Sequence, residues 1–131
     1  MALSATLVGS ASSTTSGTSL VVTTTATIPA NSTVLVAIAA DNSGSGGTSN
    51  LVTPAVPAGL ATQNPGVNTP WTTFTRSPGG AANDGAVVGM WVYNSGPTAI
   101  ASGATFTYSF GTTTSKAAQV WYLSSSISGS F

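Results

Sequence analysis

Apolar and hydroxyl-bearing side chains alternate along several short segments of this chain, and this alternation restricts its fold more than any other feature. It is clearest over residues 20–28, where one face carries Leu20, Val22, Thr24, Ala26 and Ile28. The other face carries Val21 and three threonines. A period of two residues is that of a β-strand. The segment is therefore predicted to be a strand whose first set of side chains faces a core.

Turn-forming residues separate this segment from the next one. Pro29-Ala30-Asn31-Ser32 predicts a turn, because proline fixes φ and asparagine tolerates the left-handed region. Residues 33–40 then return as a second strand, with Val34, Val36 and Ile38 on its predicted core face. The run Asp41-Asn42-Ser43-Gly44 that follows ends the pattern.

Five further segments have strand character, and none has a helical period. The chain contains 22 threonines and 20 serines, so β-branched residues are abundant, and the helix formers glutamate, lysine and arginine are almost missing. Short strands separated by glycine- and proline-containing turns indicate an all-β fold. We expect a single domain over residues 1–131, an antiparallel β-sandwich of seven or eight strands with immunoglobulin-like or jelly-roll wiring. The further strands are predicted at residues 5–11, 71–77, 86–93, 104–110 and 115–124.

The middle of the chain, residues 41–70, is rich in proline and glycine and irregular in pattern. It holds four of the seven prolines, at positions 54, 57, 65 and 70. A structureless stretch of this length is uncommon inside a compact domain and is usually functional. We expect either a short edge strand near residues 51–56 or an extended arm. Residues 125–131 are predicted to be a loose tail.

Only four side chains carry a formal charge, namely Asp41, Arg76, Asp84 and Lys116, and the net charge is zero. One lysine and one arginine cannot neutralise the phosphates that a nucleic-acid binder contacts. The absence of histidine and cysteine removes the usual ligands of transition metals and the commonest general base. The composition thus predicts no catalytic residues, no metal, no cofactor and no nucleic-acid partner. The four charges are expected to be solvated side chains or two surface ion pairs.

The sequence also lacks the signals of a membrane protein. The longest apolar run, from Val34 to Ala40, is far shorter than the ~20 residues that span a bilayer. No basic residue precedes the short apolar stretch at the N-terminus, as a secretory signal would require. We therefore expect Met1 to be the true start and the protein to be made in the cytoplasm, with a processed secreted chain as the open alternative.

Two predicted strands are apolar on both faces, which is unusual because an antiparallel sandwich strand normally leaves one face wet. Something is therefore expected to cover the outer sheet, either residues 41–70 or another subunit. The aromatic residues could instead be buried in the core or form a sugar-stacking platform. The candidate interface residues are Trp91, Tyr93, Trp121, Leu123 and Trp71.

Three segments together resemble the β-sandwich domains of tailed-phage virion proteins. They are the strand–turn–strand of Ile28 to Asp41, the tryptophan strand of Val87 to Tyr93, and the alternating strand of Ile100 to Phe110. The resemblance covers most of residues 19–123 and concerns scaffold positions, so it assigns no functional residues. Asn31-Ser32 stands where many relatives have glycine, and the proline-rich middle is unusual for such domains.

The resemblance implies a structural virion protein, most like a capsid decoration (cement) protein. On that basis we expect a homo-oligomer, with a trimer favoured, that contacts the major capsid protein on the surface of the virion. Two alternatives remain open at this point. One is a tail-fibre or adhesin module that binds host glycans, and the other is a secreted bacterial surface-layer or pilus-type domain.

Overall fold

The computed structural model describes residues 4–42, 54–62, 72–76, 85–113 and 115–123. These residues form eight β-strands and contain no helix, so the prediction of an all-β chain is confirmed. The first four strands are β1 (Ala5–Ser13), β2 (Gly17–Thr23), β3 (Thr33–Asn42) and β4 (Leu60–Thr62). The last four are β5 (Thr72–Arg76), β6 (Gly85–Ser95), β7 (Thr105–Thr113) and β8 (Lys116–Leu123).

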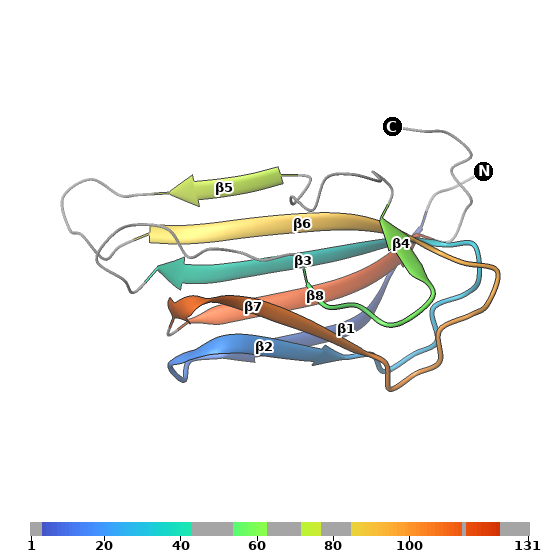
Figure 1. The fold of residues 1–131 in the computed structure, drawn as a ribbon, viewed down its shortest axis with the longest axis horizontal. Helices are drawn as coiled ribbons and strands as arrows, with labels where there is room; N and C mark the ends of the chain where they lie inside the picture. Colours follow the sequence, from blue (N-terminus) through green and yellow to red (C-terminus); the bar gives the residue numbers. More distant parts are fainter. Residues whose placement is uncertain (1–3, 43–53, 63–71, 77–84, 114, 124–131) are drawn as a thin grey trace.

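The strands form two antiparallel sheets. The larger sheet has the order β1-β8-β3-β6-β4, and β5 also pairs with β6. The smaller sheet consists of β2 and β7. Figure 1 shows β2 and β7 lying together across β1 and β8. The side of the larger sheet that faces β2 and β7 is called the inner face below, and the opposite side the outer face.

The pairings are nested, so that the first part of the chain pairs with the last part in reverse order. β1 pairs with β8, β2 with β7, and β3 with β6. The register continues through the connections, because Ile28 between β2 and β3 forms a bridge to Ile100 between β6 and β7. The chain segments on either side of residues 43–84 therefore run alongside one another from end to end.

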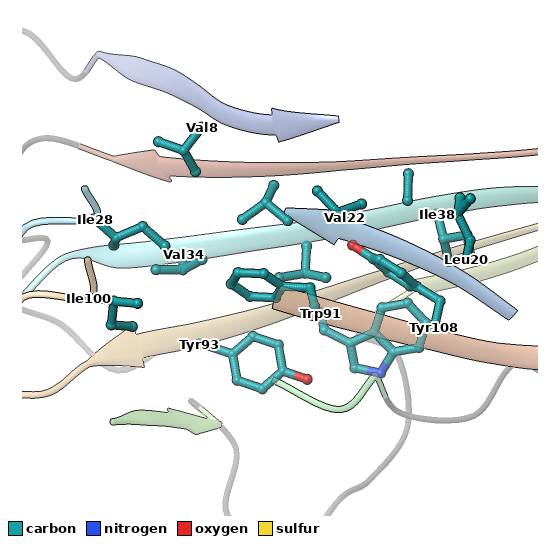
Figure 2. Packing of buried hydrophobic residues seen from close by; sticks show 14 residues of the cluster. Val8, Leu20, Val22, Ile28, Val34, Ile38, Trp91, Tyr93, Ile100 and Tyr108 are labelled. Atoms are coloured by element: carbon teal, nitrogen blue, oxygen red, sulfur yellow. The ribbon is translucent and has the colours of Figure 1, made fainter. Parts of the chain in front are cut away.

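The core lies between the two sheets. Val34, Val36 and Ile38 of β3 turn inward as the alternation predicts, and each is at most 2% exposed. Leu20 and Val22 of β2 and Tyr108 of β7 close the core from the other side (Figure 2). Phe106 of β7 belongs to the same cluster. Burying these side chains removes apolar area from water, the dominant favourable contribution to folding. The remaining core residues are Val8, Ile28, Trp91, Tyr93, Ile100, Ala118 and Val120.

The predicted turn at residues 29–32 is tied to the end of β6. Asn31 has a φ of 55°, a left-handed conformation that asparagine adopts more readily than most residues. The buried Ser95 hydroxyl accepts a hydrogen bond from Ser32 N at 2.7 Å and donates one to Pro29 O at 2.8 Å. One side chain thus satisfies two backbone groups of the turn.

The predicted strand of residues 20–28 is shorter than expected and ends at Thr23. Beyond it, Thr24 N bonds to Ala104 O at 2.9 Å and Thr25 N bonds to Val8 O at 2.7 Å. The backbone thus passes from the smaller sheet toward β1, and the alternation stops. Thr24 and Ile28 are nevertheless buried as predicted, whereas Ala26 is exposed.

The described part of the middle segment, residues 54–62, reaches from one sheet to the other. Ala55 forms a bridge to Thr107 of β7, and Leu60 of β4 pairs with Ser95 of β6. Val56 and Leu60 pack against the core cluster. Of the short edge strand expected near residues 51–56, the described residues contain the single bridge at Ala55. The predicted C-terminal tail lies outside the described residues.

Candidate interaction surface

Four apolar residues form a row across the outer face of the larger sheet. Leu7 of β1 lies directly opposite Trp121 of β8, Trp121 lies opposite Leu35 of β3, and Leu35 lies opposite Val92 of β6. Residues directly opposite one another on neighbouring strands have adjacent side chains on the same face. Leu7 is 42% exposed, and the other three are partly exposed. These four residues are called the apolar row.

Small and apolar side chains flank the apolar row on the same face. Leu123 and Thr33 stand opposite one another on one side of it, and Met90 and Ala37 on the other. Val88 of β6, which is 38% exposed, lies opposite Ala39 one pair further along. Between Thr33 and Ala39, the outward-facing residues of β3 and the residues opposite them on β8 and β6 carry no charge. Asp41 follows on the same side of β3, so charge is absent around the apolar row and returns at the end of the strand.

No described strand packs over the outer face. The contacts of β2 and β7 with the larger sheet involve β1, β8 and β3 from the inner side. Residues 54–62 contact β7 and the end of β6. Contiguous apolar faces on folded domains are typical of interaction sites, so this face is the candidate interaction surface.

The structure divides the predicted interface residues between the two sides of the larger sheet. Trp121 and Leu123 are half-buried on the outer face. Trp91 and Tyr93 point into the core and are 3% and 2% exposed, so these two candidate interface residues are core residues, which is the alternative that the sequence left open. The cause is register, because Trp91 lies opposite Val36 and shares its inner face. Trp71 lies outside the described residues.

Three aromatic side chains in the core carry polar atoms without a hydrogen-bond partner among the described residues. They are Trp91, Tyr93 and Tyr108, which Figure 2 shows gathered on one side of the core. Burial raises the pKa of Tyr93 to about 12. Burial also raises the pKa of Tyr108, and the neighbouring Tyr93 raises it further. Both phenols therefore remain neutral well above the pH at which an exposed tyrosine ionises.

A second feature, the polar end cluster, joins three strand ends through Asp41, Thr113 and Lys116. The Thr113 hydroxyl lies 2.5 Å from both Asp41 O and Asp41 Oδ1. Lys116, which is 6% exposed, donates from Nζ to Thr15 O at 2.5 Å and to Thr113 O at 3.3 Å. The expectation that Lys116 is a solvated surface charge was therefore wrong. Its ammonium is buried and satisfied by backbone carbonyls.

The polar end cluster borders an open hollow of about 660 Å³. Ser12, Ser13, Thr14, Thr15 and Ser115 supply hydroxyls to its wall. The ammonium of Lys116 and the carboxylate of Asp41 are both engaged within the chain. The hollow therefore offers hydroxyl and backbone groups to a neighbouring molecule and no uncommitted charge.

The described residues contain no group of three histidine, cysteine, aspartate or glutamate side chains that could hold a metal ion. Among the same residues there is no helix long and apolar enough to cross a membrane.

The sequence interpretation missed three of the four members of the apolar row, namely Leu7, Leu35 and Val92. A signal for Leu35 was present, because it alternates with Val34 and Val36 and must point away from the core that they fill. Leu7 lies beside a β-bulge between Leu7 and Gly9. A bulge changes which residues share a face, so the face of Leu7 could not be read from alternation alone.

The chain matches no protein-family model, and neither curated proteins nor solved structures show significant similarity to it.

Proposed function

We propose that this protein is a non-enzymatic structural component of a tailed phage that decorates and stabilises the capsid. In this proposal it self-associates and contacts the major capsid protein on the outside of the shell, after synthesis in the host cytoplasm. The observation that carries the proposal is the apolar row of Leu7, Trp121, Leu35 and Val92 on the outer face.

The chemistry of that face suits a repetitive assembly. Contacts between apolar and hydroxyl surfaces are not screened by salt, in contrast to contacts between exposed charges. When many copies on one shell are linked to one another, the assembly binds the shell stably even though each single contact is weak. A chain with zero formal net charge has little electrostatic protection against association. These properties fit a protein that works packed against neighbours.

The strand pairing supports the jelly-roll alternative for the wiring over the immunoglobulin-like one. A jelly roll is a long hairpin rolled up so that its first strand pairs with its last and each inner pair follows in order. β1 with β8, β2 with β7 and β3 with β6 follow that order. β4 and β5 depart from it, because both pair with β6. Jelly rolls occur in viral capsid proteins and lectins, so this support is an analogy of fold.

Shell binding tests the proposal. Purified protein is incubated with undecorated capsids of the phage that encodes it, and the capsids are pelleted at low and high salt. We expect wild type to co-sediment at both salt concentrations and Trp121→Ala to bind more weakly. Val21→Ala is the matched control, because Val21 is 47% exposed on the smaller sheet. Failure of the wild-type protein to bind shells overturns the proposal.

A trimer is the oligomer that the resemblance to decoration proteins implies, since such proteins occupy threefold or quasi-threefold positions on the shell. Light scattering on protein eluted from assembled particles measures this number. Three copies per unit would support the assignment to such positions, and a strict monomer would contradict it.

Glycan binding is the second candidate function, and one observation favours it. Trp121 Nε1 donates to Gln119 Oε1 at 3.3 Å on the outer face, so an indole ring and a side-chain amide stand together. Aromatic faces stack on sugar rings, and amides bond to hydroxyls. Binding on a glycan array that disappears in Trp121→Ala, with the fold retained, would support this candidate over capsid decoration.

A further inference from the structure

We propose that the hollow beside the polar end cluster binds a neutral saccharide. It lies where the β1–β2 turn, the end of β3 and the start of β8 meet, at the left-hand end of Figure 1. Its volume of about 660 Å³ falls within the roughly 300–1,000 Å³ of small-molecule sites. The inference goes beyond the proposed function, because this site acts in the isolated protein and needs no shell.

Small side chains form the floor of the hollow. Ser12 of β1 lies opposite Ala117 of β8, and Ala117 lies opposite Ala39 of β3. All three are exposed and line the hollow. Further along the same side of β8 stand the larger side chains of Gln119 and Trp121. The two alanine methyl groups therefore offer a shallow apolar floor to the C–H face of a sugar ring.

Hydroxyl groups surround this floor. Ser13, Thr14 and Thr15 stand at the β1–β2 turn, and Ser115 precedes β8. The Ser13 hydroxyl accepts a hydrogen bond from Thr15 N at 3.1 Å and can still donate its own proton. A hydroxyl both donates and accepts, as the hydroxyls around the edge of a sugar ring do. The wall thus matches a saccharide group for group.

The charges at the hollow disfavour an ionic ligand. The ammonium of Lys116 is bonded to Thr15 O and Thr113 O. The carboxylate of Asp41 accepts a bond from the Thr113 hydroxyl. An anion would be repelled by the carboxylate and a cation by the ammonium. One carboxylate is also too few for Ca²⁺, which takes about six to eight oxygen ligands. A neutral ligand is therefore favoured.

The polar end cluster also holds the wall of the hollow in place. Thr113, which is 0% exposed, ties β7 to Asp41 at the end of β3. Asp41 N donates to Ser115 O at 2.8 Å, which fixes the start of β8 against the same residue. A site that is already ordered loses less conformational entropy when a ligand binds.

Titrations with neutral saccharides, followed by protein NMR, test the inference. The probes are glucose, galactose and N-acetylglucosamine, each as the monosaccharide and as a linear trisaccharide. Ala39→Leu fills the hollow, and Ser12→Ala removes one of its hydroxyls. Ala26→Leu and Ser102→Ala are the matched controls, because they make the same changes at exposed positions outside the hollow. All four positions are exposed, so we expect each variant to fold, which thermal melting checks.

We expect at least one probe to bind wild type with a dissociation constant in the millimolar range or below. Ala39→Leu should weaken that binding at least tenfold, and Ser12→Ala about three- to tenfold, as the loss of one hydrogen bond implies. Both controls should bind like wild type. The inference is overturned if no probe binds, or if Ala39→Leu binds as tightly as Ala26→Leu.

Two comparisons separate this site from the functions proposed above. Binding that is lost in Trp121→Ala and retained in Ala39→Leu would place the sugar on the indole ring and overturn the hollow as its site. A wild-type protein that binds shells but no saccharide would overturn the inference and leave decoration standing. Saccharide binding that depends on Ala39, in a protein that binds no shell, would support the inference and contradict decoration.

Discussion

Gly9 of β1 lies against Val22 of β2 so closely that a Cβ on Gly9 would stand 2.8 Å from Val22 Cγ1. The same Cβ would lie 3.0 Å from Thr23 O. The β-bulge between Leu7 and Gly9 sits at this contact. The absence of a side chain at position 9 therefore lets β1 of the larger sheet approach the end of β2 in the smaller one.

Gly9→Ala is expected to lower the free energy of unfolding by about 1–3 kcal/mol, the usual cost of overpacking a filled site. Urea denaturation measures the effect. Gly17→Ala is the matched control, because the nearest atom to its added Cβ is Lys116 Nζ at 3.8 Å, an ordinary contact. Equal stability of Gly9→Ala and wild type would show that β1 and β2 separate more easily than the contact implies.

Ser95→Ala is expected to lower the free energy of unfolding by about 1–3 kcal/mol, because it leaves buried backbone groups unpaired. The groups affected are Ser32 N and Pro29 O, which the hydroxyl contacts at 2.7 and 2.8 Å. Thermal melting measures the loss. Ser102→Ala serves as the control, since the exposed Ser102 makes only a 3.4 Å contact with Thr24 O. A loss in Ser102→Ala as large as that in Ser95→Ala would contradict the assignment.

Lys116→Met is expected to destabilise the fold by about 1–3 kcal/mol, although methionine preserves most of the buried stem. The carbonyls of Thr15 and Thr113 would lose the ammonium that bonds to them. Gln119→Met, at an exposed position of the same strand, is the control and should change stability little. If both variants melt like wild type, the buried ammonium contributes nothing to holding the strand ends together.

The free energy of unfolding is expected to be independent of tyrosine ionisation below about pH 10 and to fall as the pH rises above it. Tyr93 has a folded-state pKa of about 12, above the value of about 10 in an unfolded chain. A raised folded-state pKa stabilises the fold at low pH, and this contribution is lost as the pH rises through it. Tyrosine absorbance and urea melts across alkaline pH measure the effect.

Tyr93→Phe and Tyr108→Phe should each reduce this alkaline loss. The phenol oxygens have no hydrogen-bond partner among the described residues, so their removal should cost little stability at neutral pH. A large loss at neutral pH in either variant would show that the oxygen does have a partner.

Much of the fold could be predicted from alternation alone. Val34, Val36 and Ile38 are buried where the period of two places them. Pairing could not be predicted, because a strand pattern gives the face of a residue but not its neighbour. The end of β2 at Thr23 depends on backbone bonds to Ala104 and Val8, which lie far away in sequence. No local pattern encodes them.

The candidate surface was predicted only in part, and for a related reason. Trp91 and Trp121 both stand in strands that are apolar on both faces, so composition could not say which tryptophan points outward. The pairing with Val36 places Trp91 inside, and the pairing with Leu7 and Leu35 places Trp121 outside. Lys116 was misjudged because the carbonyls that bind it come from Thr15 and Thr113. A sequence pattern does not show where such backbone carbonyls will lie in the fold.

The nested pairing has a consequence for how the chain folds as it leaves the ribosome. When β3 has been synthesised, its partner β6 and the partners of β1 and β2, which are β8 and β7, do not yet exist. These three partner strands all lie after residue 84. Val8 and Val22, which are buried in the folded protein, therefore stay exposed during this time. β1 gains its partner only when β8, the last strand described, leaves the ribosome. Such long-range pairing is slow and leaves apolar strands open to aggregation in the interval. Slowing synthesis would therefore prolong the exposed state rather than help the first half to fold.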